Sequence, residues 1–184
     1  MEVMGRDNIP KKGGLILASN HISYLDPVVL GTSIDRKIYF MAKKEIFDNI
    51  GGSFILRNLN AFPVDRTKAD ITAFKKAITV LKEGKILGIF PEGARSSSGG
   101  LQDLKLGVLK IAQKAEVPVL PVGIIGTNKI YPPGRKLPLF SKNKIIVNYG
   151  IPLYFTRINL KDKEGQKEAI DLLSNKMKEL ITSK

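Results

Sequence analysis

Short apolar runs alternate along this chain with longer segments whose apolar residues recur every three or four positions. The runs cover residues 15–18, 37–42, 85–90, 117–125 and 144–149, and helical spacing marks the segments that follow Pro27 and those at 67–84, 104–112 and 161–184. Runs of this length are typical of buried strands, and the longer spacing is typical of amphipathic helices. Strands that alternate with helices predict an α/β fold, with a mostly parallel or mixed sheet flanked by helices.

The sequence shows no internal repeat and no linker that would divide the chain of 184 residues. We therefore expect one domain over residues 1–184, with a motif-bearing core at 8–149 and a C-terminal helix at 161–184. No apolar run reaches the length of a membrane span, and the polar segment 1–14 does not resemble a signal peptide. These patterns predict a protein without a transmembrane span, located in the cytoplasm or at the cytoplasmic face of a membrane.

The composition is strongly basic. The 30 Lys and Arg residues outnumber the 17 Asp and Glu residues and give a net charge of +13, which favours an anionic partner. Nucleic acid, an anionic membrane surface and phosphorylated substrates all fit this charge. The absence of cysteine excludes disulfides and a thiolate nucleophile, and with a single histidine we expect neither a metal site nor a cofactor.

The sole histidine, His21, follows the first apolar run, and Asp26 stands five positions later, directly before Pro27. This order predicts that His21 lies on the turn between a strand and a helix, where open α/β sheets bind ligands. Asp26 is expected to be the N-cap of that helix. A histidine with a carboxylate beside it is suited to exchange a proton near neutral pH. A loop-bonded histidine beside a simple capping aspartate explains the pattern equally well.

A second polar loop, residues 91–100, follows the strand predicted at 85–90 and belongs on the same edge of the sheet. It carries Glu92, Gly93, Arg95 and Ser96. Gly93 permits close approach of a ligand to the backbone, and the planar guanidinium of Arg95 suits phosphate oxygens. Glu92 has two possible partners, a substrate hydroxyl or Arg95. Taken alone, this run of polar residues is typical of a solvated loop with an internal salt bridge. Two polar loops at strand ends of a basic domain, however, favour a ligand-binding site.

Two further cations are candidates for binding an anion. Arg66 follows a brief strand at 60–65 that contains a proline, and Lys105 is predicted at a helix N-terminus, where phosphates bind well. Each is, alone, more typical of an exposed surface charge. Arg57 competes with Arg66 for the same role, and we prefer Arg66 because it directly follows Val64-Asp65. Between basic residues, the apolar positions 46, 47 and 54–56 belong either to the core or to a membrane contact.

Local signals also predict where some helices begin and end. Thr67 is the expected N-cap of the helix that ends before Gly84, because Asp70 stands in a capping-box position. The glycine pair at 51–52 is expected to end a short helix that begins near residue 43.

Four motifs, in their order along the chain, resemble those of the glycerophospholipid acyltransferase family. They are Asn20-His21-x-Ser23-x-x-Asp26, Val64-Asp65-Arg66, Phe90-Pro91-Glu92-Gly93-x-Arg95-Ser96 and Val117-Pro118-Val119-x-Pro121-Val122. The resemblance spans about residues 8–149, and the family's α/β fold agrees with the alternating pattern. Ala94 is a departure, since threonine is common at that position.

The resemblance implies transfer of an acyl group from acyl-CoA or acyl-carrier protein to the free hydroxyl of lysophosphatidic acid, which gives phosphatidic acid. It implies that His21 is the general base and that Asp26 orients it. Arg66, Arg95 and Lys105 would bind the acceptor's phosphate, and Glu92 and Gly93 would shape its pocket. Ser96, in the same motif, is a further candidate for substrate binding. The hydroxyl attacks the thioester directly, so the enzyme supplies no nucleophile. It further implies a peripheral protein on the inner face of the plasma membrane, in contact with anionic lipid.

Other functions remain open on the sequence alone. A sibling activity would use another lysophospholipid or glycerol-3-phosphate as acceptor. A basic nucleic-acid-binding domain fits the charge, but the chain has no strand motif that combines aromatic and basic residues for base stacking. A Ser–His–Asp hydrolase that uses Ser23 or Ser96 would ordinarily carry a Gly-x-Ser-x-Gly elbow, which this sequence does not contain.

Overall fold

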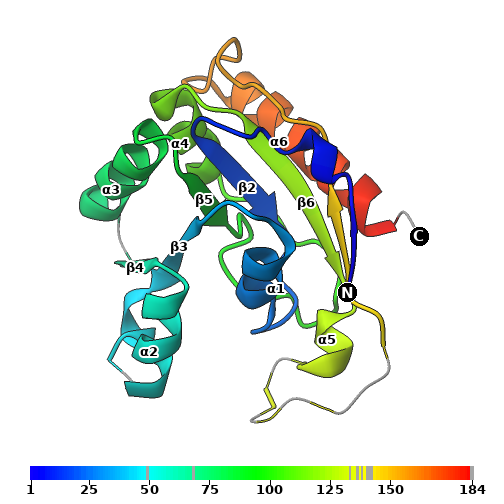
Figure 1. Cartoon of the computed structure of the whole chain (residues 1–184). Helices are drawn as coiled ribbons and strands as arrows, with labels where there is room; N and C mark the ends of the chain where they lie inside the picture. The colour runs from blue at the N-terminus through cyan, green and yellow to red at the C-terminus, as the bar shows by residue number, and fades with distance from the viewer. Residues whose placement is uncertain are drawn as a thin grey trace.

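A mostly parallel sheet crosses the middle of the computed structural model, which describes residues 1–48, 50–67, 69–132, 134, 135, 137, 139 and 143–182. In this part of the chain the sheet has seven strands in the order β1-β7-β6-β2-β5-β3-β4 (Figure 1). Among the described strands, β6 and β7 alone pair in antiparallel fashion. The strands are β1 (Glu2–Met4), β2 (Leu15–Ser19), β3 (Ile38–Lys43), β4 (Ala61–Val64), β5 (Ile86–Ile89), β6 (Val119–Ile125) and β7 (Ile146–Tyr149). The expected α/β class is confirmed.

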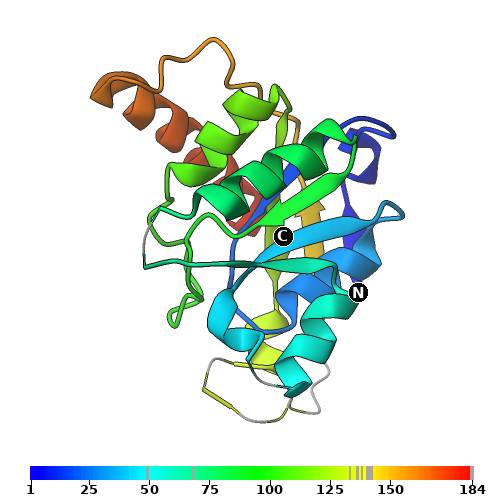
Figure 2. The same ribbon diagram turned by 90° about the vertical axis from the view of Figure 1, so that its left-hand side faces the viewer.

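Helices cover both faces of the sheet, as Figures 1 and 2 show. They are α1 (Asp26–Ser33), α2 (Ile50–Asn58), α3 (Ile71–Lys82), α4 (Gly107–Ala115), α5 (Thr127–Ile130) and α6 (Lys163–Thr182), with 3-10 turns η1 (Arg6–Asn8) and η2 (Lys44–Ile46). Among the described helices, none is both long and apolar enough to cross a bilayer.

The core consists of two apolar layers separated by the sheet. Along β2, Ile16 and Ala18 face the layer formed with α3, α4 and α6, whereas Leu15 and Leu17 face the layer that contains α1. This division follows from the alternation of side chains along a strand. All four side chains are fully buried, because a central parallel strand is covered on both faces.

Several expected boundaries are wrong. The glycine pair at 51–52 does not end a helix, since α2 runs through it from Ile50 to Asn58. The expected N-cap Thr67 bonds Asp65 instead, and the cap of α3 is Asp70, whose side chain accepts a hydrogen bond from the Ala73 N–H at 2.9 Å. Strand β1 and helix α5 lie in segments that the periodicity did not assign to an element.

Three further corrections concern the site and the C-terminal helix. Asp26 is the first residue of α1 rather than its cap, and Leu25 takes the N-cap position. Lys105 directly precedes Leu106, the N-cap of α4, so it lies just outside the helix N-terminus rather than in its first turn. The helix expected at 161–184 is observed from Lys163 to Thr182, and residues 183 and 184 lie outside the described part of the chain.

Candidate active site

The polar loops predicted from the sequence meet at one edge of the sheet. Strands β3, β4, β5 and β6 pair parallel to one another or to β2, so their carboxyl ends point the same way. The loop that carries His21 leaves β2 at this edge, and the loop that begins at Phe90 leaves the neighbouring strand β5. We call this side of the sheet the carboxyl edge. It is the position at which α/β folds bind their ligands.

The Asp26 carboxylate organises the first loop. It is fully buried, and its Oδ2 accepts hydrogen bonds from His21 Nδ1 at 2.8 Å and from the backbone N–H groups of Ile22 and Ser23, each at 2.7 Å. Its Oδ1 accepts a bond from Thr127 Oγ1, at the start of α5, at 2.6 Å. Because an ionised carboxylate can only accept, His21 Nδ1 carries a proton and the lone pair of the neutral ring lies on Nε2.

His21 is also held by the second loop. Its backbone N–H donates to Glu92 Oε1 at 2.7 Å, and its carbonyl accepts from the Ser96 N–H at 2.7 Å. The imidazole stacks on the Phe90 ring with a centroid separation of 4.0 Å and an interplanar angle of 19°. The side chain keeps 18% of its surface exposed, so the ring is fixed in orientation while part of it stays accessible.

Glu92 joins the two loops. Its Oε2 accepts from the Gln102 N–H at 2.9 Å, so each carboxylate oxygen bonds one backbone N–H. Burial raises the pKa of the Glu92 carboxyl, although the two N–H bonds act in the opposite direction. Of the two partners considered for Glu92, Arg95 is not the one observed, because Arg95 bonds Tyr24.

Two cations meet at Gly93, the residue after Glu92. Arg66 Nη1 donates to the Gly93 carbonyl. The Lys105 side chain lies over Gly93 so closely that a Cβ built there would be 2.7 Å from Nζ. Gly93 also has a φ of +76°, which side chains disfavour. The positive φ favours glycine here, and an added Cβ would push the Lys105 side chain aside. The position of Gly93 brings Arg66 and Lys105 together beside the His21 loop.

Arg95 supplies a third positive group near the histidine. Its guanidinium carbon lies 3.5 Å from the centroid of the Tyr24 ring, and Nη2 donates to the Tyr24 hydroxyl at 2.8 Å. Nη1 is buried and has no hydrogen-bond partner among the described residues. A buried donor without a partner is costly, so an anionic oxygen is a suitable ligand for this nitrogen.

The sequence model described as Acyltransferase matches residues 1–125. The chain belongs to the acyltransferase family.

Relatives and a solved structure agree with this assignment. The chain is 35% identical over 182 residues to the 1-acyl-sn-glycerol-3-phosphate acyltransferase of Bacillus subtilis. The alignment covers 98% of this chain and 87% of that protein. It is 34% identical over 162 residues to the enzyme of the same name from Streptococcus pneumoniae, covering 86% of this chain and 58% of that protein. The crystal structure of the 1-acyl-sn-glycerophosphate (LPA) acyltransferase PlsC from Thermotoga maritima superposes with a TM-score of 0.76 at 30% identity, covering 100% of this chain and 73% of that one.

The serine hydroxyls of this acyltransferase are engaged away from the imidazole. Ser23 Oγ donates to the Tyr131 carbonyl at 2.7 Å, and Ser96 Oγ lies 3.2 Å from Ser98 Oγ. A serine nucleophile needs a hydrogen bond to the histidine base, so this arrangement disfavours the hydrolase alternative. Of the two arginines that competed for the second motif, Arg66 contacts the site loop, whereas Arg57 lies in the last turn of α2.

Sequence reasoning missed four residues of the acyltransferase site. Thr127 holds Asp26 from a position 101 residues away, which no local pattern reveals. Gln102 anchors Glu92 through its backbone, so its side-chain type carried no signal. Tyr24 and Phe90 were readable as aromatic residues inside the first and third motifs, and their contacts with Arg95 and His21 follow once the two loops are placed together.

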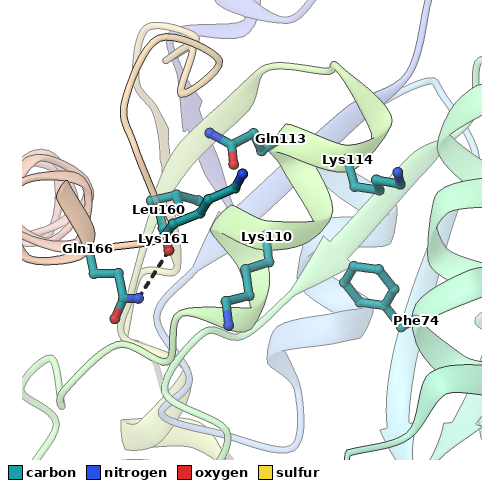
Figure 3. A pocket seen from close by; sticks show the side chains of 7 residues that line it. All are labelled: Phe74, Lys110, Gln113, Lys114, Leu160, Lys161 and Gln166. Atoms are coloured by element: carbon teal, nitrogen blue, oxygen red, sulfur yellow. Dashed lines mark hydrogen bonds between the residues drawn. The ribbon is translucent and has the colours of Figure 1, made fainter. Parts of the chain in front are cut away.

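A basic pocket lies apart from these residues, in the helical layer (Figure 3). It has a volume of about 570 Å³ and is lined by Phe74, Lys110, Gln113, Lys114, Leu160, Lys161 and Gln166. These residues come from α3, α4, the segment before α6 and the first turn of α6. Gln166 Nε2 donates to the Leu160 carbonyl at 3.0 Å across its wall. None of the predicted site residues lines this pocket.

Proposed function

We propose that this acyltransferase moves a fatty acyl group from an acyl thioester to the 2-hydroxyl of 1-acyl-sn-glycerol-3-phosphate, which gives phosphatidic acid. The observation that carries the proposal is the His21 Nδ1 contact with buried Asp26 beside the cations gathered at Gly93. The names of the relatives from Bacillus subtilis and Streptococcus pneumoniae support this acceptor.

In the proposed reaction His21 acts as general base. Nε2 takes the proton of the acceptor hydroxyl while that oxygen attacks the thioester carbonyl carbon, and the negatively charged Asp26 stabilises the imidazolium that forms. When the tetrahedral intermediate collapses, the carbon–sulfur bond breaks and the imidazolium returns the proton to the thiolate leaving group. The products are an ester, a free thiol and the neutral histidine, so no group on the enzyme is acylated.

The acceptor's phosphate is proposed to bind the cations at the carboxyl edge. Arg66 and Lys105 reach Gly93 from two different segments, and Arg95 offers a buried Nη1 donor. Bidentate guanidinium–phosphate contacts are among the strongest hydrogen bonds in proteins. Glycerol-3-phosphate and other lysophospholipids are the competing acceptors, and they differ in the phosphate charge and in the acyl chain that they present.

The proposal is tested by incubating the protein with lysophosphatidic acid and a panel of acyl-CoA and acyl-carrier-protein donors, with products resolved by mass. We expect phosphatidic acid, and His21→Ala should lower its rate by roughly 10²–10⁴-fold. Ser97→Ala, an exposed change in the second loop, is the matched control and should keep activity. Preference for glycerol-3-phosphate or for a lysolipid without a phosphomonoester would refute the acceptor assignment.

The same assay compares the two donor classes directly. We also propose a peripheral position on the cytoplasmic face of the membrane, because the net charge of +13 favours anionic lipid and the proposed acceptor resides in bilayers.

A further inference from the structure

Helix α2 carries apolar side chains on its outward face. Phe54 and Ile55 are 71% and 55% exposed, whereas Ser53 and Leu56 are half-buried. The helix packs against β4, the edge strand of the sheet. A surface helix of a water-soluble domain usually turns polar residues outward and its apolar stripe inward. In α2 two large apolar residues are on the solvent side, so this face suits a less polar environment than water.

The outward face of α2 lies at the same end of the molecule as the site. Strand β3 ends at the carboxyl edge, and η2 and α2 follow it directly. Figures 1 and 2, which differ by a quarter turn about the vertical, both place α2 and α5 at the lower end of the molecule. Helix α5 begins with Thr127, which bonds Asp26. Ile46 in η2 is 40% exposed and adds a third apolar side chain to this end.

Positive charge accompanies these apolar residues. Arg57 is exposed in the last turn of α2 and is the cation nearest in sequence to Phe54 and Ile55. Lys43 and Lys44 are exposed where β3 passes into η2, where they form surface ion pairs with Glu45 at 3.5 Å and Asp65 at 2.7 Å. Apolar insertion combined with Lys and Arg at the headgroup level is how interfacial helices bind anionic membranes. A second protein chain fits less well, because a stable interface buries about 800 Å² on each partner and three apolar side chains provide much less.

We propose that α2 docks this protein on an anionic lipid bilayer, with Phe54 and Ile55 inserted at the headgroup boundary and Ile46 and Arg57 beside them. This orientation turns the carboxyl edge, with His21, toward the membrane surface. The inference rests on the proposed function in one respect: a bilayer is where the acceptor resides, so a docked site meets its substrate without extracting it into water.

Vesicle flotation of the full chain tests the docking face. The probes are phosphatidylcholine vesicles with and without phosphatidylserine, and the variant is the double change Phe54→Asp, Ile55→Asp. The matched control is Ile151→Asp, Tyr154→Asp. These residues are 72% and 67% exposed and follow β7, which runs antiparallel to β6 and so ends at the opposite end of the sheet. Both double changes lower the net charge by the same amount, so a difference in flotation between the two variants reports the position of the substituted residues.

We expect the wild type to float with the anionic vesicles. The α2 variant should partition at least about tenfold less, because each exposed apolar side chain contributes to insertion, and the control should change by less than about twofold. Equal losses in the two variants, or no loss in either, would overturn the proposal. So would a wild type that forms a dimer which the α2 variant alone disrupts, since α2 would then be a protein interface.

Activity separates this inference from the proposed function. The α2 variant should lose acylation of lysophosphatidic acid presented in vesicles and keep acylation of the same lipid dispersed in detergent micelles. Loss of both activities in the folded variant would contradict a docking role. If the wild type acylates neither form, the proposed function fails, while flotation still decides whether α2 binds the bilayer.

Discussion

Replacing Asp26 by asparagine removes a charge while preserving the shape of the group. The amide oxygen, placed where Oδ2 lies, can accept from His21 Nδ1 and from the N–H groups of Ile22 and Ser23. The amide nitrogen then faces Thr127 Oγ1, which can accept in place of donating. Since three donors favour this orientation over the flipped one, the loop and the histidine tautomer should persist. The variant therefore isolates the electrostatic contribution of the carboxylate.

The magnitude follows from the geometry. Opposite unit charges about 4 Å apart attract by about 4 kcal/mol at an effective dielectric constant near 20. The imidazolium charge is only partly developed in the transition state, and half of this energy, about 2 kcal/mol, corresponds to a roughly 30-fold lower kcat. Asp26→Ala differs because it leaves the N–H groups of Ile22 and Ser23 without their acceptor, at about 1–3 kcal/mol each, and so lowers the free energy of unfolding.

Steady-state kinetics and urea unfolding on the two variants test this reasoning. Asp26→Asn should lower kcat about 30-fold, leave KM for lysophosphatidic acid nearly unchanged and shift the free energy of unfolding by about 1 kcal/mol or less. Asp26→Ala should lose activity and stability together. If Asp26→Asn keeps kcat within about threefold of wild type, the charge does not act on the imidazole in the rate-limiting step, and the role of Asp26 is to hold the loop.

Three further changes test the surroundings of the site. Gly93→Ala should lower the free energy of unfolding by about 1–2 kcal/mol, because φ is +76°, and raise KM for the acceptor, because the new Cβ displaces Lys105; urea unfolding and kinetics measure both effects. Burial raises the pKa of Glu92 in the folded protein. The protonated carboxyl therefore stabilises the fold below the ordinary pKa of about 4.3, and this stabilisation is lost as pH rises through the folded-state pKa. The plot of unfolding free energy against pH for Glu92→Gln should lack this loss. Hydrogen bonds from the Ala73 and Asp65 N–H groups lower the pKa of Asp70 in the folded protein. The ionised carboxylate therefore stabilises the fold above the ordinary pKa of about 4, and this stabilisation is lost as pH falls through the lower folded-state pKa. Asp70→Ala should lower Tm near neutral pH, and the difference from wild type should shrink in acid.

The edge of the sheet that carries the site was predictable from the sequence. His21 and the loop at 91–100 each follow an apolar run, and parallel strands place their carboxyl ends together. The brief strand before Arg66 contains a proline, which favours an edge strand or an irregular one, and among the described strands β4 lies at the edge and pairs with β3. These features depend on local pattern and chain direction, both of which a sequence contains.

The contacts that complete the site were not predictable, because they join segments far apart in the chain. The bond between Thr127 and Asp26 spans 101 residues, and the bond between Tyr24 and Arg95 spans 71. Asp26 was expected to cap its helix because aspartate before proline commonly does so, yet the loop N–H groups of Ile22 and Ser23 attract its carboxylate instead. Packing against β4 likewise holds α2 helical through two glycines that disfavour a helix in isolation.

The base and the cations are fixed by different parts of the fold, so chemistry and acceptor binding should be separable. His21 is oriented by Asp26, and its loop is tied at the backbone N–H to Glu92 and at the carbonyl to Ser96. Arg66 donates to the Gly93 carbonyl, and the Lys105 side chain lies over Gly93, so the two cations meet the second loop at this residue. Lys105→Ala should consequently raise KM for the acceptor and leave kcat nearly unchanged, whereas His21→Ala should lower kcat in a protein that still binds the acceptor. A Lys105→Ala enzyme with normal KM and reduced kcat would mean that this lysine stabilises charge in the transition state rather than the bound phosphate.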